Sequence, residues 1–191
     1  MNRPWPHLCG ERVILRLATD KNVPQIIAFY RDNAAHLETI SSPKPNSFYT
    51  TEFWTQKVRS SHEDFQIDRS CNFFIFDIAD DCMLLGFANF FSFIRGAFHA
   101  CILGYGLAQS AQGKGLMTES LRLAIDFAFN ELNLHRIMAN HSPTNVRSAR
   151  VLRRLNFLPE GYARDYLLVH NEWQDQVLNA LTNPNWKPPQ T

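Results

Sequence analysis

The residues best suited to chemistry form a short glycine-rich segment at positions 112–115, between an apolar run and a second apolar pattern of helical period. Glycines let the backbone fold tightly, so that several N–H groups point inward. Together with the positive end of the following helix, these donors form a site for phosphate oxygens, and the lysine adds charge at the rim. We therefore expect a phosphorylated cofactor to contact Leu107, Ala108, Gln112, Gly113, Lys114, Gly115, Leu116 and Met117.

Two common nucleotide loops do not fit this segment. A Walker loop reads Gly-x-x-x-x-Gly-Lys-Ser/Thr, but Ala108 stands at its first position and Gly115 takes the place of the magnesium-binding hydroxyl. A dinucleotide fingerprint fails as well, because Gly104 and Gly106 are followed by Gln109 at the third site. A turn that simply begins a helix remains the alternative to a phosphate site.

The elements that position this loop follow from hydrophobic period and turn residues. We expect strands at 11–17, 72–79, 83–94, 98–108, 136–140, 157–169 and 172–181, and helices starting near residues 20, 50, 116 and 145. Loops are expected at 41–47 and at the turn Asp80-Asp81. This mixture predicts an α/β or α+β fold with one sheet. We expect a single domain, 1–191, with its core at about 11–182 and a loosely attached, proline-rich tail at 183–191.

Composition and charge exclude several classes of protein. The 191 residues carry 19 Lys and Arg against 18 Asp and Glu, a net charge of +1, which argues against a dedicated nucleic-acid reader. No apolar run approaches the roughly 18 residues of a membrane span, and residues 1–10 lack the apolar region of a signal peptide. The scattered cysteines show no zinc spacing, so we expect buried thiols, no metal and a reducing cytoplasm.

Two separated motifs resemble those of the GNAT acetyltransferases. The acetyl-CoA loop of that family reads Gln/Arg-x-x-Gly-x-Gly/Ala, matched here by Gly113 and Gly115, with Ser110 as a departure at the first position. Downstream, Asn145 and Ser148 match Asn-x-x-Ala/Ser, while Asn156-Phe157 replaces Gly-Phe. The resemblance implies acetyl-CoA as co-substrate, Asn145 beside it, and a mostly antiparallel, V-splayed sheet flanked by helices.

Four further segments resemble a narrower branch of that family, the enzymes that acetylate the N-terminal alanine of a small-subunit ribosomal protein. They are residues 95–101, 112–117, 135–140 and 162–168. The resemblance implies transfer of an acetyl group to a protein amino terminus by direct attack on the thioester, with a ribosomal protein, and the ribosome, as partners. It leaves the oligomeric state open.

The resemblance also suggests how the reaction is assisted. It places the oxyanion near the backbone N–H of Leu107 or Ala108. Many relatives protonate the leaving thiolate with a Tyr seven residues after the Asn, but that position is Leu152 here. Ser148 is the alternative acid, as in the ribosomal-protein branch. In a purely structural interpretation, Asn145 and Ser148 only satisfy N–H groups at the start of a helix.

The general base is less defined by the sequence. A protein α-amine has a pKa of about 8, so a modest base or water suffices near neutral pH. Glu160 and Asp165 are our candidates, with surface carboxylates as the alternative, and Tyr166 is a third polar group. Histidines titrate in the right range, but each one here is more easily explained as structural. Phe90, Phe91 and Phe93 are candidates for a pocket around the alanine methyl group, or for core.

Two other functions fit the same features. In the first, the fold and cofactor are the same, but the amine that accepts the acetyl group is a polyamine, an amino acid or an antibiotic. Alternatively the protein is a ribosome-associated assembly factor in which acetyl-CoA binding is secondary, an idea that the Leu at position 152 favours.

Overall fold

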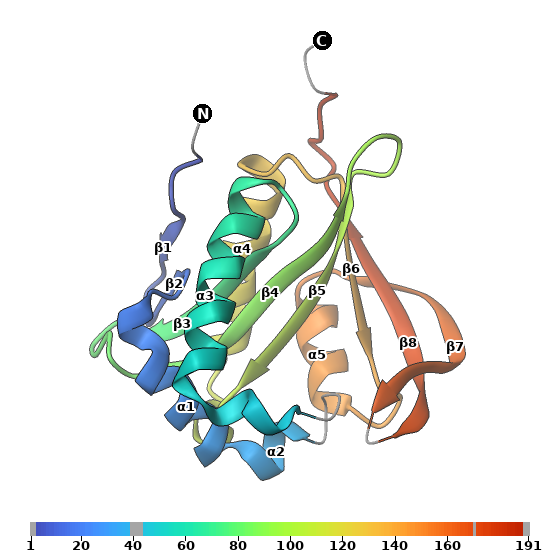
Figure 1. The fold of residues 1–191 in the computed structure, drawn as a ribbon. Helices are drawn as coiled ribbons and strands as arrows, with labels where there is room; N and C mark the ends of the chain where they lie inside the picture. Colours follow the sequence, from blue (N-terminus) through green and yellow to red (C-terminus); the bar gives the residue numbers. More distant parts are fainter. Residues whose placement is uncertain (1–2, 39–43, 170, 189–191) are drawn as a thin grey trace.

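The computed structural model describes residues 3–38, 44–169 and 171–188, and these residues build one eight-stranded sheet in the order β1-β2-β3-β4-β5-β6-β8-β7 (Figure 1). The strands are β1 His7–Cys9, β2 Val13–Arg16, β3 Cys71–Asp77, β4 Leu84–Ile94, β5 Ala100–Leu107, β6 Arg136–His141, β7 Leu158–Val169 and β8 Glu172–Thr182. The α-helices are α1 Val23–Asp32, α2 Ala34–Glu38, α3 Thr51–Gln66, α4 Leu116–Asn130 and α5 Val146–Arg154. Short 3-10 turns are η1 Asp20–Asn22, η2 Asn46–Tyr49 and η3 Gln109–Ala111.

The sheet is splayed between β5 and β6, its one parallel pair. These strands are paired only where Ala100–Ile102 lies beside Arg136–Met138, and Figure 1 shows them diverging toward their carboxyl ends. Every other pairing between neighbours is antiparallel. The main-chain groups on one edge of residues 103–107 therefore have no neighbouring strand, and α5 begins at this end, next to β6.

Helices cover the two faces of the sheet unequally. On one face, α1 and α3 pack on β3 and β4, where Phe87 meets Tyr30 and Phe74 meets Trp54. On the opposite face, α4 packs on β1, β2 and β4, and its Phe127 ring contacts Phe73 of β3. Because side chains alternate along a strand, these two layers require apolar residues at nearly every position of β3. This explains its nearly continuous apolar sequence.

Most expected elements are present. The helix at 116–130, the strand–turn–strand around residues 80–81 and the hairpin after α5 are confirmed. The sequence pattern missed β1 and α2, which are three and five residues long and too short to show a period. Of the expected loop at 41–47, residues 41–43 lie outside the described part, and 46–47 begin a short 3-10 turn.

Two local expectations are wrong. Residues 183–188 are not a loose tail, because Asn183 is buried and the Trp186 ring packs against His99 and His135 at centroid distances of 5.0 and 5.6 Å; residues 189–191 lie outside the described part. Only two of the four cysteines, Cys71 and Cys101, are buried. Cys9 and Cys82 are exposed because they lie in the edge strand and in a turn. Within the described residues, no helix is long and apolar enough to cross a membrane.

Candidate active site

The glycine-rich loop has the backbone of an anion cradle. Gly113 and Gly115 have φ of 76° and 80°, a left-handed conformation that strains other residues. A Cβ placed on Gly113 would meet nothing within 4 Å, so only the backbone angle demands glycine there. Gly115 is the N-cap of α4 and supplies no side-chain cap. The first N–H groups of α4 thus have no capping side chain, and they can bind an anion.

A clamp formed by Arg12, the residue just before β2, holds this loop. Arg12 Nη1 donates to the carbonyl oxygen of Lys114 at 2.9 Å, and Arg12 Nε donates to Glu119 Oε2 at 2.8 Å. The backbone N–H of Arg12 also donates to Glu119 Oε1 at 2.8 Å. Burial alone raises the pKa of Glu119, but the hydrogen bonds and charge of Arg12 bring it below its usual value. Arg12 escaped the sequence reasoning because it lies 102 residues from Lys114.

Gln112 links the loop to two helices. Its Oε1 accepts a hydrogen bond from Arg147 Nη1 of α5 at 2.5 Å, and its Nε2 lies 2.5 Å from His36 Nε2 of α2. The side chain of Gln112 therefore connects α2 to α5, while the backbone N–H groups of residues 113–117 remain for an anion.

At the splay, a hydroxyl pair joins β5 to α5. Asn145 Oδ1 accepts the Ser148 N–H at 3.0 Å, so Asn145 caps α5. The Ser148 hydroxyl is not part of that cap, and its Oγ lies 2.6 Å from the Tyr105 hydroxyl. Burial raises the pKa of Tyr105 to about 12, even though the hydrogen bond to Ser148 lowers it. Tyr105 was missed, although it shares a face of β5 with Leu107 two residues on.

Only one of the two expected oxyanion donors is available. The Ala108 N–H donates to the Leu85 carbonyl at 2.8 Å, so the expectation of a free donor there is wrong. Leu107 faces Gly86 as the next pair of this antiparallel ladder. Because the direction of the N–H alternates along a strand, the Leu107 N–H points away from β4, toward the splay.

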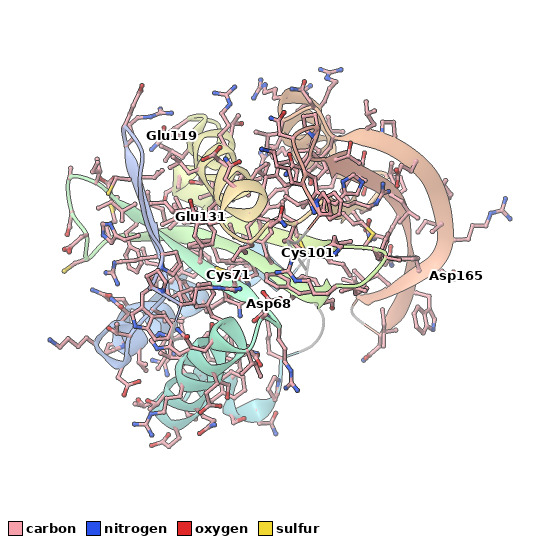
Figure 2. The ribbon with its side chains drawn as sticks, turned by 90° about the horizontal axis from the view of Figure 1, so that it is seen from above. Asp68, Cys71, Cys101, Glu119, Glu131 and Asp165 are labelled. Carbon is pink, nitrogen blue, oxygen red and sulfur yellow. The ribbon has the colours of Figure 1, made fainter. Side chains whose placement is uncertain are left out.

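The structure does not bring the two candidate bases to this hydroxyl pair. Both belong to β7, the edge strand, which β8 and β6 separate from β5. Glu160 forms an ion pair with Arg136, at the end of β6 opposite the splay. Asp165 is exposed at a bulge with φ of 46°, and its N–H donates to Asp175 Oδ1 at 3.0 Å. Figure 2 shows Asp165 on the outer rim of the β7–β8 hairpin.

The remaining predicted groups are dispersed. Tyr166 is exposed on β7, and Leu152 lies in the core at the position of the missing Tyr. His99 and His135 lie under Trp186, while His141 is buried at the splayed end of β6. Phe90 is core and contacts Phe73, whereas Phe91 and Phe93 line a hollow on the other face of β4.

A splayed parallel pair, an uncapped helix start at α4 that can bind an anion, and a hydroxyl pair between β5 and α5 are together the features of a site for a phosphorylated cofactor. The acetyltransferase (GNAT) domain matches residues 12–158. The chain therefore belongs to the GNAT acetyltransferase family, and the expected fold, with its mixed, mostly antiparallel sheet, is confirmed. The expected enzyme class is confirmed too: this is a family of acetyl-CoA-dependent N-acetyltransferases.

Individual relatives are similar over nearly the whole chain. The [ribosomal protein uS5]-alanine N-acetyltransferase of Escherichia coli is 39% identical over 187 residues, which cover 98% of this chain and 96% of the relative. The ribosomal-protein-S5-alanine acetyltransferase of Vibrio fischeri superposes with a TM-score of 0.91 at 32% identity, covering 96% and 100% of the two chains. RimJ of Mycobacterium smegmatis, in complex with CoA-disulfide, gives 0.84 at 25% identity, covering 100% and 90%.

Proposed function

We propose that this chain transfers the acetyl group of acetyl-CoA to the N-terminal alanine of a small-subunit ribosomal protein. The observation that carries the substrate is the 39% identity, over 98% of the chain, to an enzyme named for alanine of ribosomal protein uS5. Its place of action is then the cytoplasm, where ribosomal proteins are made, and its partner is that protein, free or on the ribosome. We infer one catalytic domain, because a single hydrophobic cluster extends from Val13 to Phe157.

In this proposal, the loop and two helices hold the cofactor. The backbone N–H groups of Gly113, Lys114 and Gly115, with those of Leu116 and Met117, bind the pyrophosphate. The Arg12 clamp holds the carbonyl of Lys114, which keeps the loop in shape. Asn145 acts through its cap, which fixes the start of α5 beside the thioester. Acetyl-CoA supplies the activated acetyl group.

The attack needs orientation more than a strong base. An α-amine with a pKa of about 8 is free in roughly one molecule in ten at pH 7. Holding that amine against the thioester carbonyl replaces a bimolecular encounter, and the Leu107 N–H stabilises the oxyanion. As the C–N bond forms, the excess proton of the nitrogen leaves to water. Neither Glu160 nor Asp165 is required, which fits their places on β7.

The hydroxyl pair stabilises the leaving sulfur when the C–S bond breaks. A thiol has an ordinary pKa of about 8.5, while that of Tyr105 is about 12. Passing the phenol proton to the thiolate is therefore uphill by roughly 5 kcal/mol. We assign the pair a hydrogen-bonding role instead. Tyr105, the more acidic hydroxyl, donates to Ser148 Oγ, which leaves the Ser148 hydrogen free to point at the sulfur.

The test is a choice among amines. The purified protein is incubated with acetyl-CoA and with peptides that begin in Ala, Ser or Met, next to spermidine and free amino acids. Mass spectrometry should show acetylation of the Ala peptide first. Transfer to small amines with none to any peptide would contradict the proposal. If the wild-type protein acetylated none of these amines but still bound ribosomes, the alternative of a ribosome-associated assembly factor would be favoured. Intact masses of ribosomal proteins, with and without the enzyme in cells, identify the natural substrate.

A further inference from the structure

The two faces of β6 are covered unequally at the splay. Ile137, Ala139 and His141 are buried, whereas Met138 and Asn140, which alternate with them, are only half-buried. Successive side chains of a strand point to opposite faces of the sheet. One face of β6 is therefore covered within the chain, while the other is partly accessible to solvent. We call the face that carries Met138 and Asn140 the open face.

The covered face is the one on which α5 lies. Cys101 and Ile137 are paired in register, and Tyr105, four residues after Cys101, lies on the same face and contacts Ser148 of α5. In the proposed function, the leaving sulfur lies at this pair of hydroxyls, so α5 occupies that side of the thioester. The acceptor amine therefore has to reach the thioester carbonyl from the open face.

Gly104 leaves space on the open face at the edge of the splay. It lies two residues beyond Ile102, the last residue of β5 that is paired with β6. A Cβ placed on Gly104 would meet only Phe91 within 4 Å, at an ordinary contact distance of 3.4 Å, and its φ is not in the left-handed region. Neither packing nor backbone angle therefore requires glycine here, although glycine weakens a strand. Such a glycine often marks the close approach of a ligand or of another backbone.

Asn140 lies across the splay from Gly104. Ile102 and Met138 are the last residues paired between β5 and β6, and Gly104 and Asn140 each follow by two positions, so both lie on the open face. Within the described part of the chain, the Asn140 side chain makes no hydrogen bond. Both polar atoms of its amide retain contact with solvent. The amide thus offers a donor and an acceptor at the splay, neither of which the fold uses.

We propose that Asn140 is a specificity-determining residue that binds the first residue of the acceptor, for which Gly104 leaves room. In an extended chain the N–H and the C=O of one residue point the same way. Asn140 Oδ1 accepts a hydrogen bond from the α-amine, and Nδ2 donates to the carbonyl of the same residue. This inference rests on the proposed function. It explains a preference for amino termini over polyamines and lysine side chains, whose amines have no carbonyl beside them.

The test compares a hexapeptide that begins with Ala and an analogue whose first peptide bond is replaced by a trans-alkene, which keeps the shape but removes the carbonyl. The wild type should acetylate the analogue with a kcat/KM about tenfold lower, as for one lost hydrogen bond. Asn140→Leu, which keeps the size of the side chain, should lower kcat/KM about 100-fold for the peptide but only about tenfold for the analogue. The difference is the coupling between the Asn140 amide and the carbonyl.

Asn130→Leu is the matched control, because Asn130 is exposed at the end of α4 and donates only to Asp126. It should leave both rates unchanged. If Asn140→Leu does not fold, Gly104→Ala serves as the second variant. Its added methyl group should lower kcat/KM for the peptide about tenfold without lowering the melting temperature, whereas Gly161→Ala, where a Cβ also meets nothing within 4 Å, should not.

Two results would overturn this inference and leave the proposed function standing. One is an Asn140→Leu variant that loses the same factor with peptide and analogue, as a purely structural role would give. The other is a wild type that acetylates both acceptors equally well. Acetylation of neither acceptor by the wild type would instead refute the proposed function, and this inference with it.

Discussion

The two sides of the splay between β5 and β6 are built differently. On the cofactor side, α4 buries eight of its residues, and the loop before it is held by Arg12 and Gln112. On the β7–β8 side, eleven of the twelve residues of β7 are exposed or only partly buried. Figure 2 shows the same contrast, with Glu119 on α4 within the body and Asp165 on the rim. A small cofactor needs a preformed site, whereas a protein acceptor brings its own structure to a more open surface.

Substitutions in the cofactor loop should have the largest effect on activity. Gly113→Ala should raise the KM for acetyl-CoA by about 100-fold, because the left-handed backbone that aims the N–H groups is strained by a Cβ. Gly96→Ala is the matched control, since Gly96 also has a left-handed φ, of 68°, with nothing within 4 Å of an added Cβ, but lies in the β4–β5 loop. Steady-state kinetics and thermal melting of both variants separate cofactor binding from strain. Equal effects on KM would contradict the cradle.

The hydroxyl pair should give the next largest effect. Ser148→Ala and Tyr105→Phe should each lower kcat about 10- to 30-fold with little change in either KM. The first removes the hydrogen bond to the leaving sulfur, and the second removes the phenol that donates to Ser148 Oγ and orients its hydroxyl. If Tyr105 acts only through Ser148, the double variant should be no slower than Ser148→Ala. Independent, additive losses would refute that coupling.

The pH dependence of kcat/KM in the wild type and in Tyr105→Phe tests the hydrogen-bonding role of the phenol. For the wild type, kcat/KM should rise with pH up to the pKa of the α-amine, about 8, and then stay level. With its pKa at about 12, Tyr105 remains protonated throughout this range. A second pKa near 9 or 10 that disappears in Tyr105→Phe would show that the phenol titrates during catalysis, contrary to the hydrogen-bonding role.

The Arg12 clamp should matter less than the loop it holds. Glu119→Gln should raise the KM for acetyl-CoA about fivefold, as expected for one weakened charged hydrogen bond. The pKa of Glu119 is lowered in the folded protein, so its carboxylate stabilises the fold above the unfolded pKa, and this stability is lost as pH falls through the folded value. Denaturant titrations should therefore show that wild type and variant differ in stability at pH 7, and that the difference disappears as the pH falls through the lowered pKa of Glu119.

The smallest effect is expected on the open side. Glu160→Gln and Asp165→Asn should each change kcat less than about threefold, because water accepts the amine proton and both carboxylates lie on β7. Rates of acetylation of an Ala peptide, measured for the wild type and both variants from pH 6 to 9, would check this. If kcat fell about 100-fold in either variant, and the decrease of the rate at acidic pH also disappeared, that residue would be the general base. The open side would then contribute a catalytic residue.

The sequence alone determined the features that depend on neighbouring residues. The glycines of the loop, the Asn145 cap and the start of α4 were predictable, since a left-handed turn and a helix cap are decided within a few positions. The family followed from two such local motifs in the right order. Tertiary structure decided what depends on which strands are neighbours. It placed Tyr105 beside Ser148, 43 residues away, put Arg12 under the loop, and left Glu160 and Asp165 on an edge strand. Those outcomes depend on the splay between β5 and β6 and on the order of the last two strands, and no local pattern carries that information.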